Sequence, residues 1–199
     1  VAVAMVACRA PDPGPPEDID YGPRGDCNPV DPGHCLLPYP SSFFLEDDAQ
    51  SATGVRVRFG ARSLPVDTEG TPWAPERWNL KDGFPVLGSL YAHFPGADLT
   101  GVTGLADLGA FADDDATTLI VHADTGERLP HFVEHDMDSA GTDRQLLILR
   151  PVTPMAHGQR YVVGIRGLRR AADGTPFAAP PGFANLRDGG NWTLDLDLE

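Results

Sequence analysis

Alternating apolar and polar positions in the second half of the chain predict a series of short β-strands. Four segments rich in β-branched or other apolar residues follow one another, at 117–123, 129–136, 145–151 and 160–166. Turn sequences separate them, among them Asp124-Thr125-Gly126 and Asp173-Gly174. We expect the first two segments to pair as a hairpin. Strands at this spacing predict a mostly β fold, an antiparallel sandwich.

The first half of the chain has a weaker pattern and predicts more loop than strand. Residues 55–59 alternate valine and phenylalanine with arginine, which predicts a half-buried strand. Residues 36–45 are apolar and proline-containing, and we expect them to pack in an extended form against the core. Residues 60–83 predict a loop, 84–94 fit either a short helix or a strand, and 101–112 predict a loop with one helical turn.

The extreme N-terminus has the pattern of an export signal. Residues 1–7 are apolar, and Met5-Val6-Ala7-Cys8 resembles the bacterial lipobox, in which the cysteine receives lipid. Met5 departs from the leucine that this motif prefers. The alternative is a short buried strand that ends in a free cysteine. Arg9, which follows Cys8 directly, resembles the signal for sorting to the outer membrane in bacteria with two membranes.

Residues 9–26 predict a solvated tether that would lift a domain off the membrane. They contain five prolines with acidic residues between them, and no strand or helix period. A lipid anchor followed by such a spacer indicates an exported protein held on the bacterial outer membrane or cell surface. No apolar run is long enough to predict a membrane-spanning helix.

The two remaining cysteines, Cys27 and Cys35, predict a disulfide. Two prolines and Gly33 bend the segment between them, so the two ends can approach the spacing that a disulfide needs. Disulfides persist in oxidising compartments, in agreement with export. The alternatives are a zinc site that uses both cysteines with His34, or free thiols, but nine residues with three ligands lack the usual four-ligand spacing.

Composition narrows the classes of function. The 20 prolines and 22 glycines argue against long helices. A formal net charge of −14 repels phosphate backbones, which disfavours nucleic-acid binding. Acidic loops can bind calcium, and Asp113, Asp114 and Asp115 are weak candidates for this, although no EF-hand spacing is present. The alternative is a solvated acidic surface. The sequence predicts no cofactor.

No complete catalytic site is predicted in this chain. Ser89 lacks the second glycine of a nucleophile elbow. The segment His131–His135 matches the H-x-x-E-H zinc-protease pattern, but that pattern needs a helix, and we predict a strand with both histidines on a solvent-facing hairpin edge. Four aromatic residues are expected in the core, with a sugar-facing or lipid-facing patch as the alternative: Trp73, Trp78, Tyr91 and Trp192.

Several turn and strand motifs together resemble a known family. They lie at 27–44, 53–57, 79–84, 124–130, 149–151 and 158–168, with Asp173-Gly174 and Phe183. This pattern resembles the N-terminal domain of bacterial virulence-factor-type secreted lipases, whose α/β-hydrolase domain comes later in the chain. The stretch with Tyr161-Val162-Val163 also resembles bacterial Ig-like modules.

The resemblance implies a non-catalytic N-terminal accessory domain of an exported lipase-like or esterase-like lipoprotein. Its partners would be the membrane, through the lipid, and a downstream hydrolase domain. The alternative is a stand-alone surface lipoprotein that binds a partner protein or a glycan. The expected organisation is a truncated signal peptide ending at the lipidated Cys8 (1–8), a proline-rich tether (9–26), a loop-rich lobe (27–115), an Ig-like β-sandwich part (116–187) and the start of a continuation (188–199).

Overall fold

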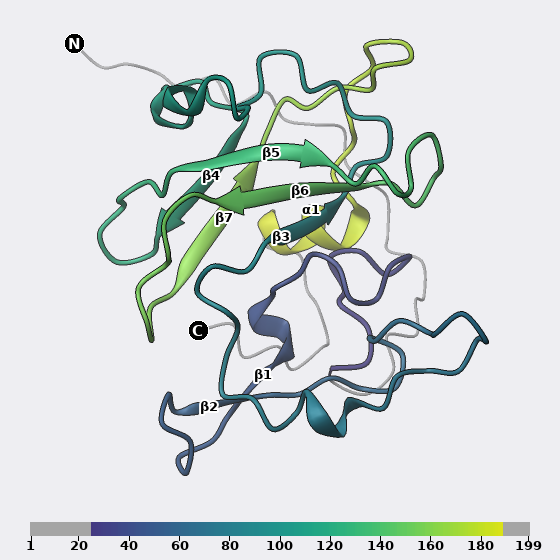
Figure 1. Cartoon of the computed structure of the whole chain (residues 1–199), viewed down its shortest axis with the longest axis vertical. Coiled ribbons are helices and arrows are strands. Elements are labelled where there is room, and N and C mark those ends of the chain that lie inside the picture. Colours follow the sequence, from purple (N-terminus) through teal and green to yellow (C-terminus); the bar gives the residue numbers. More distant parts are fainter. Residues whose placement is uncertain (1–24, 189–199) are drawn as a thin grey trace.

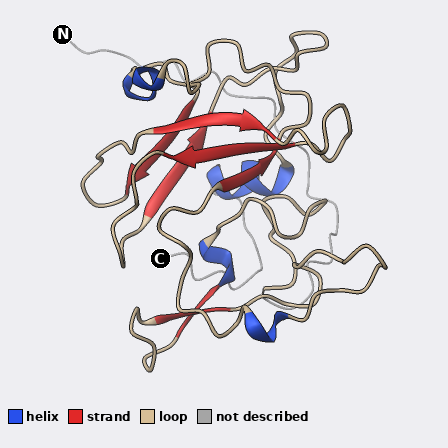
Figure 2. Ribbon diagram, in the orientation of Figure 1, coloured by secondary structure: helices blue, strands red, loops and turns tan. Residues whose placement is uncertain are grey.

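The computed structural model describes residues 25–188 of the chain (Figure 1). The predicted signal peptide with Cys8, the tether up to residue 24 and the continuation from 189 onward lie outside the described residues. The described part is mostly strand and loop, as the sequence predicts, and all of its strand pairs are antiparallel (Figure 2).

A three-stranded sheet forms the centre of the fold. It has the order β3-β6-β5, from β3 (Leu90–His93), β6 (Leu146–Pro151) and β5 (His131–His135). Strand β6 is central, with both of its edges paired, and its Leu147 and Leu149 are fully buried in the hydrophobic core. Since β3 pairs with β6, the ranges 27–115 and 116–187 share this sheet. The ambiguous segment 84–94 is therefore a strand in its second half.

Two further strand pairs complete the fold. Strand β4 (Thr118–His122) pairs with β7 (Tyr161–Ile165), and β1 (Leu45–Asp47) pairs with β2 (Val55–Val57). Short 3-10 helices lie in the loops, namely η1 (Ser42–Phe44), η2 (Pro75–Arg77) and η3 (Leu108–Ala112). Helix η3 corresponds to the single helical turn predicted within 101–112.

The predicted hairpin of 117–123 with 129–136 is present only next to its turn, where Val121 and Arg128 form an antiparallel bridge. The turn itself is present: Gly126 has a φ of 72°, and the Leu129 N–H still donates to the Ile120 carbonyl at 2.7 Å. The pairing of these two segments ends at this bond, and the Pro130 carbonyl instead accepts from the Val152 N–H at 2.8 Å. Beyond it β5 pairs with β6, and β4 pairs with β7.

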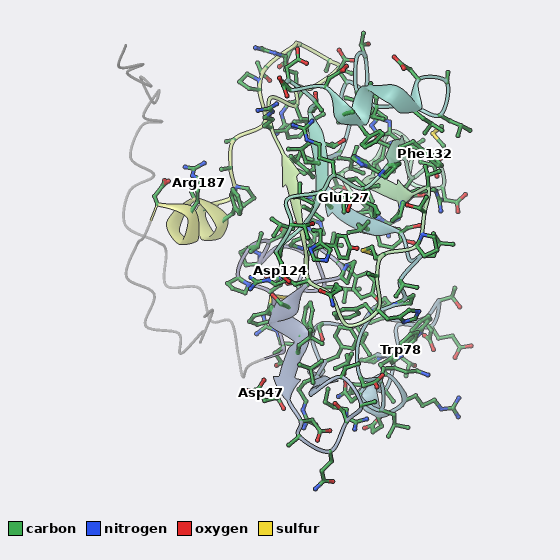
Figure 3. The ribbon with its side chains drawn as sticks, turned by 90° about the vertical axis from the view of Figure 1, so that its left-hand side faces the viewer. Asp47, Trp78, Asp124, Glu127, Phe132 and Arg187 are labelled. Atoms are coloured by element: carbon green, nitrogen blue, oxygen red, sulfur yellow. A yellow bond between two sulfur atoms is a disulfide. The ribbon has the colours of Figure 1, made fainter. Side chains whose placement is uncertain are left out.

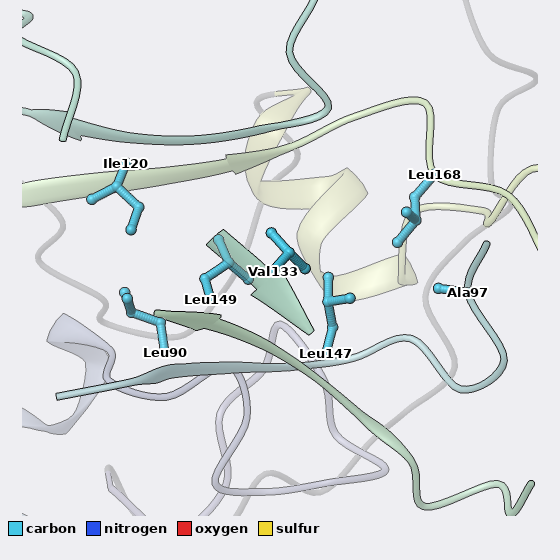
Figure 4. Close-up of a cluster of buried hydrophobic side chains, with 7 residues drawn as sticks. All are labelled: Leu90, Ala97, Ile120, Val133, Leu147, Leu149 and Leu168. Carbon is cyan, nitrogen blue, oxygen red and sulfur yellow. The ribbon is translucent and has the colours of Figure 1, made fainter. Parts of the chain in front are cut away.

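The main hydrophobic core joins the central sheet to β4. Leu90, Leu147, Leu149 and Val133 of the sheet pack with Ile120 of β4, and the cluster extends to Ala97 and Leu168 (Figure 4). At about 25 cal/mol per Å² of apolar surface, such burial is the dominant favourable contribution to folding. A second, smaller cluster of Phe44, Val57 and Phe59 holds β1 and β2 against η1.

Helix α1 (Pro181–Arg187) was not predicted from the sequence. Its first turn contains Pro181, a position where the missing N–H costs nothing. Figure 3 shows the helix, with Arg187 labelled, standing beside the strands rather than between them. Within residues 25–188, no helix is long and apolar enough to cross a membrane.

The loop-rich first half meets the central sheet along the free edge of β3. Tyr39 and Tyr91 exchange two backbone hydrogen bonds, at 2.9 and 2.7 Å, which extend the sheet by one residue of the first half. Their rings also face each other, with centroids 6.2 Å apart. This contact brings residues that follow the N-terminal disulfide loop next to the end of β3.

Candidate functional site

Three ionisable side chains converge where the first half meets β3. Asp31, His34 and His93 each offer one ligand atom, and these atoms all lie within 4.8 Å of one another. The His34 Nδ1 atom is 3.3 Å from each carboxylate oxygen of Asp31, and the His93 Nδ1 atom is 4.0 Å from Asp31 Oδ2. The two imidazole rings lie in contact, with centroids 3.7 Å apart.

The N-terminal loop of this cluster is closed by the predicted disulfide. Cys27 and Cys35 are bonded, with the sulfur atoms 2.07 Å apart. Inside the loop, the Asn28 N–H donates to the Cys35 carbonyl at 2.9 Å, and the His34 N–H donates to the Asp31 carbonyl at 3.0 Å. Asp31 and His34 therefore belong to one tight turn, whose hydrogen bonds place both side chains on the same side of the loop.

The disulfide also removes the alternative zinc site of two cysteines and His34. A thiolate is the metal-binding form of cysteine, and neither sulfur of a disulfide is a thiolate. His34 instead contacts an aspartate and a histidine, two residues that the sequence analysis did not single out.

His93 is oriented by a second loop. It is the last residue of β3, and its Nε2 atom lies 2.6 Å from the carbonyl oxygen of Asp143. A carbonyl only accepts, so Nε2–H is the donor. In the neutral imidazole the remaining lone pair is then on Nδ1, the nitrogen nearer Asp31. The side chains of His93 and Asp31 are each 19% exposed, and that of His34 is 36% exposed, so solvent reaches the cluster.

The H-x-x-E-H segment is a strand, as predicted, but its predicted exposure is wrong. His131 is fully buried, and Phe111 of η3 packs against its ring, with the centroids 6.5 Å apart. Its Nδ1–H donates to the Leu129 carbonyl at 2.9 Å, so Nε2 accepts from the Thr118 hydroxyl, also at 2.9 Å. Burial lowers the pKa of His131, and the Leu129 hydrogen bond offsets this in part.

His131 and His135 do not converge on one metal. Residues four apart in a strand are about 13 Å apart along its length. His131 has two protein partners for its ring nitrogens, whereas the Nε2 atom of His135 is buried without a hydrogen-bond partner in the described part of the chain. His131 is therefore a buried structural residue of β5 rather than a metal ligand.

Ser89 lies in a polar contact with charged side chains of the central sheet. Its hydroxyl accepts a hydrogen bond from Arg150 Nη1 at 3.0 Å, and Arg150 also pairs with Glu134 across β5 and β6. A guanidinium cannot act as the general base that a serine nucleophile requires. This arrangement orients Arg150 rather than activating Ser89.

The three aspartates proposed as weak calcium ligands are not brought together as a cation site. Arg128 donates to the Asp113 carbonyl at 2.7 Å, and Arg166 donates to the Asp114 carbonyl. The Asp114 carboxylate lies 3.8 Å from Arg128. Arginine side chains therefore lie among these aspartates and accept no cation between them. Within residues 25–188, the one group of three metal-ligating side chains is the cluster with Asp31.

Two of the aromatic residues expected in the core are exposed. Trp73 and Trp78 stack with their centroids 6.2 Å apart and their planes 4° from parallel, and they are 46% and 42% exposed. Segment 60–83 forms a loop with no sheet to cover it, which explains the difference. Trp78 lies on the side of the molecule away from α1 (Figure 3). Tyr91 packs on Tyr39 as expected, and Trp192 lies outside the described residues.

No known protein family, curated protein or solved structure matches this chain. The arrangement of the chain's own residues therefore carries the functional argument. The cluster of Asp31, His34 and His93 is not evident from the sequence, because His93 lies in a different segment from the loop that holds Asp31 and His34. The carbonyl that orients His93, that of Asp143, lies a further 50 residues along the chain.

Proposed function

We propose that the chain is the non-catalytic N-terminal scaffold domain of an exported lipase-like or esterase-like lipoprotein. In this proposal, lipid on Cys8 holds the protein on the outer membrane or cell surface, residues 9–26 form the tether, and an α/β-hydrolase domain follows this chain. The observation that carries the proposal is the disulfide between Cys27 and Cys35, because such bonds persist in oxidising compartments. It lies directly after the tether.

The proposal also covers how the two sheets of the second half are arranged. We infer that the central sheet and the β4–β7 pair together form the Ig-like sandwich that the resemblance implies. In support, Ile120 of β4 packs into the same cluster as Leu149 and Val133 of the central sheet. Such a sandwich presents its loops at two ends, which suits a domain that holds a neighbouring domain in place.

Lipid labelling tests the anchor. We expect the precursor, expressed in a bacterial host with its upstream sequence, to incorporate labelled palmitate and to fractionate with membranes. Cys8→Ala should abolish both. The matched control is the double variant Cys27→Ala/Cys35→Ala, which removes the other thiols and should still be labelled. Palmitate on Cys8→Ala, or reduced thiols at Cys27 and Cys35 in the mature protein, would overturn the proposal.

Ester hydrolysis tests the scaffold role. We expect the isolated chain to hydrolyse p-nitrophenyl esters no faster than the buffer blank. The hydroxyl of Ser89 accepts a hydrogen bond from Arg150, which cannot activate it as a nucleophile. The variant Ser89→Ala should therefore hydrolyse the ester at the same blank rate. Hydrolysis above the blank that disappears in Ser89→Ala would show instead that this chain is catalytic.

The stacked tryptophans favour a second candidate, a stand-alone surface lipoprotein that binds glycans. Aromatic faces present a broad apolar surface that the C–H groups of a sugar ring can cover, and Trp73 and Trp78 expose such faces. Titration with oligosaccharides, followed by tryptophan fluorescence, should then show binding that Trp73→Ala removes. Leu80→Ala is the control, because Leu80 is 72% exposed nearby in the chain. Binding that survives Trp73→Ala and Trp78→Ala would exclude this candidate.

A further inference from the structure

We propose that Asp31, His34 and His93 bind one divalent transition-metal ion, of which zinc fits the ligands best, and that this ion fastens the disulfide loop to β3. The proposal does not depend on export, lipidation or a downstream hydrolase domain. It rests on the distances between the ligand atoms, the orientation of His93 and the types of ligand present.

The ligand spacing is close to that of a first coordination shell, since the three ligand atoms all lie within 4.8 Å of one another. Zinc lies about 2.0–2.2 Å from nitrogen and oxygen ligands, so neighbouring ligands of a tetrahedral ion are roughly 3.4 Å apart. The 3.3 Å between His34 Nδ1 and Asp31 already has this value. The 4.0 Å between His93 Nδ1 and Asp31 Oδ2 is longer than this value, so a bound zinc ion would draw these two atoms closer together.

The hydrogen bond from His93 to Asp143 supports a role for His93 as a ligand. Histidines that bind metals typically donate their other ring N–H to a carbonyl or a carboxylate, which selects the tautomer and the ring orientation. The 2.6 Å contact from Nε2 to the Asp143 carbonyl has this form. In the neutral imidazole this leaves Nδ1, the nitrogen 4.0 Å from Asp31 Oδ2, free to bind a cation together with that carboxylate.

The donor set selects the class of metal. Calcium and magnesium prefer shells made of oxygen, whereas two imidazole nitrogens with one carboxylate suit zinc and its neighbours in the transition series. The disulfide withholds both thiolates, so the protein ligands are nitrogen and oxygen only. Three ligands on a partly exposed site leave the fourth position of a tetrahedral ion to water.

The position of the cluster indicates a structural role. Asp31 and His34 belong to the disulfide loop, and His93 ends an edge strand of the central sheet. An ion bound to all three therefore cross-links the first half of the chain to the sheet. An ion that binds the folded state and not the unfolded chain stabilises the folded state as its free concentration exceeds the dissociation constant.

Calorimetric titration with zinc chloride tests the site. The full chain without a histidine tag should bind one zinc ion, and its melting temperature should rise with zinc concentration. Asp31→Asn, His34→Ala and His93→Ala should each weaken binding at least tenfold and remove the thermal shift. His157→Ala is the control, because His157 is an exposed histidine remote in sequence from all three ligands, and it should bind as the wild type does. Calcium chloride should produce no shift.

A second measurement on the unmodified chain covers variants that fail to fold. NMR spectra of the imidazole nitrogens should show zinc perturbing His34 and His93 at Nδ1 while His122 and His157 stay unchanged. Absence of zinc binding by the wild type, binding that survives both Asp31→Asn and His93→Ala in folded protein, or zinc-induced shifts confined to other histidines would each overturn the proposal.

Discussion

At the scale of single residues, His131 is the group whose burial has the clearest consequence for stability. Its side chain is fully buried with both ring nitrogens hydrogen-bonded in the neutral form. Desolvation lowers its pKa below the ordinary value of 6.5. The hydrogen bond to the Leu129 carbonyl raises the pKa, but by less. The unfolded chain therefore binds a proton at a pH where the folded chain does not.

This difference predicts acid sensitivity that belongs to His131. The contribution of the residue to the free energy of unfolding is complete above pH 6.5 and decreases as the pH falls below it. In His131→Asn, which keeps a donor near Leu129 but cannot titrate here, the decrease between pH 7.5 and 5 should be smaller than in the wild type. Urea unfolding at a series of pH values measures both. Parallel pH profiles for the two proteins would contradict the prediction.

At the scale of elements, two glycines differ in what an added methyl group would meet. Gly25 has a φ of 86°, and a Cβ there would lie 2.6 Å from the Arg58 carbonyl oxygen. Gly164, inside β7, has ordinary strand geometry, and its Cβ would lie 3.8 Å from the Leu119 side chain, an ordinary contact. One glycine is therefore required by close backbone approach, whereas the other only weakens its strand.

Alanine substitutions at these glycines should have opposite effects. Gly164→Ala should raise the free energy of unfolding by about 0.4–1 kcal/mol, because it restricts the unfolded chain without a clash. Gly25→Ala should lower it by about 1–3 kcal/mol, because it forces a strained backbone against Arg58. Urea unfolding of both variants checks this directly. A destabilised Gly164→Ala would mean that the β4–β7 pair has no room for a methyl group.

At the scale of the whole molecule, the junction between the two halves depends on a small number of contacts. The backbone hydrogen bonds of Tyr39 with Tyr91 join the first half to the central sheet. The cluster of Asp31, His34 and His93 lies at the same junction, because Tyr91 and His93 both belong to β3. The disulfide holds two of these three side chains in one turn. The covalent link and the cluster therefore act on the same junction.

Loss of the disulfide should destabilise this junction. Closing so short a loop restricts the unfolded chain by about 2–3 kcal/mol in the chain-entropy estimate. Cys27→Ser/Cys35→Ser should lower the free energy of unfolding by that amount, and zinc binding should weaken because Asp31 and His34 lose their common turn. Reducing agent should lower the free energy of unfolding of the wild type by the same amount and leave that of the double variant unchanged. Equal stability of oxidised and reduced wild type would contradict the estimate.

The sequence by itself determined the features that depend on neighbours in the chain. Strand positions in the second half follow from local alternation and turns, and the disulfide follows from two cysteines in a bent segment of nine residues. Local pattern also disfavoured helical geometry at His131–His135, because Pro130 precedes the segment and Phe132 and Val133 favour a strand.

Only the tertiary structure decided which strands pair and which distant residues meet. The expected hairpin pairs only next to its turn, and the partners of β4 and β5 come from later strands, which share the core around Ile120 and Leu149. The exposure of Trp73 and the burial of His131 depend on what covers each face. The meeting of Asp31, His34 and His93 depends on the junction at Tyr39, because no local period in a sequence records contacts between separate segments.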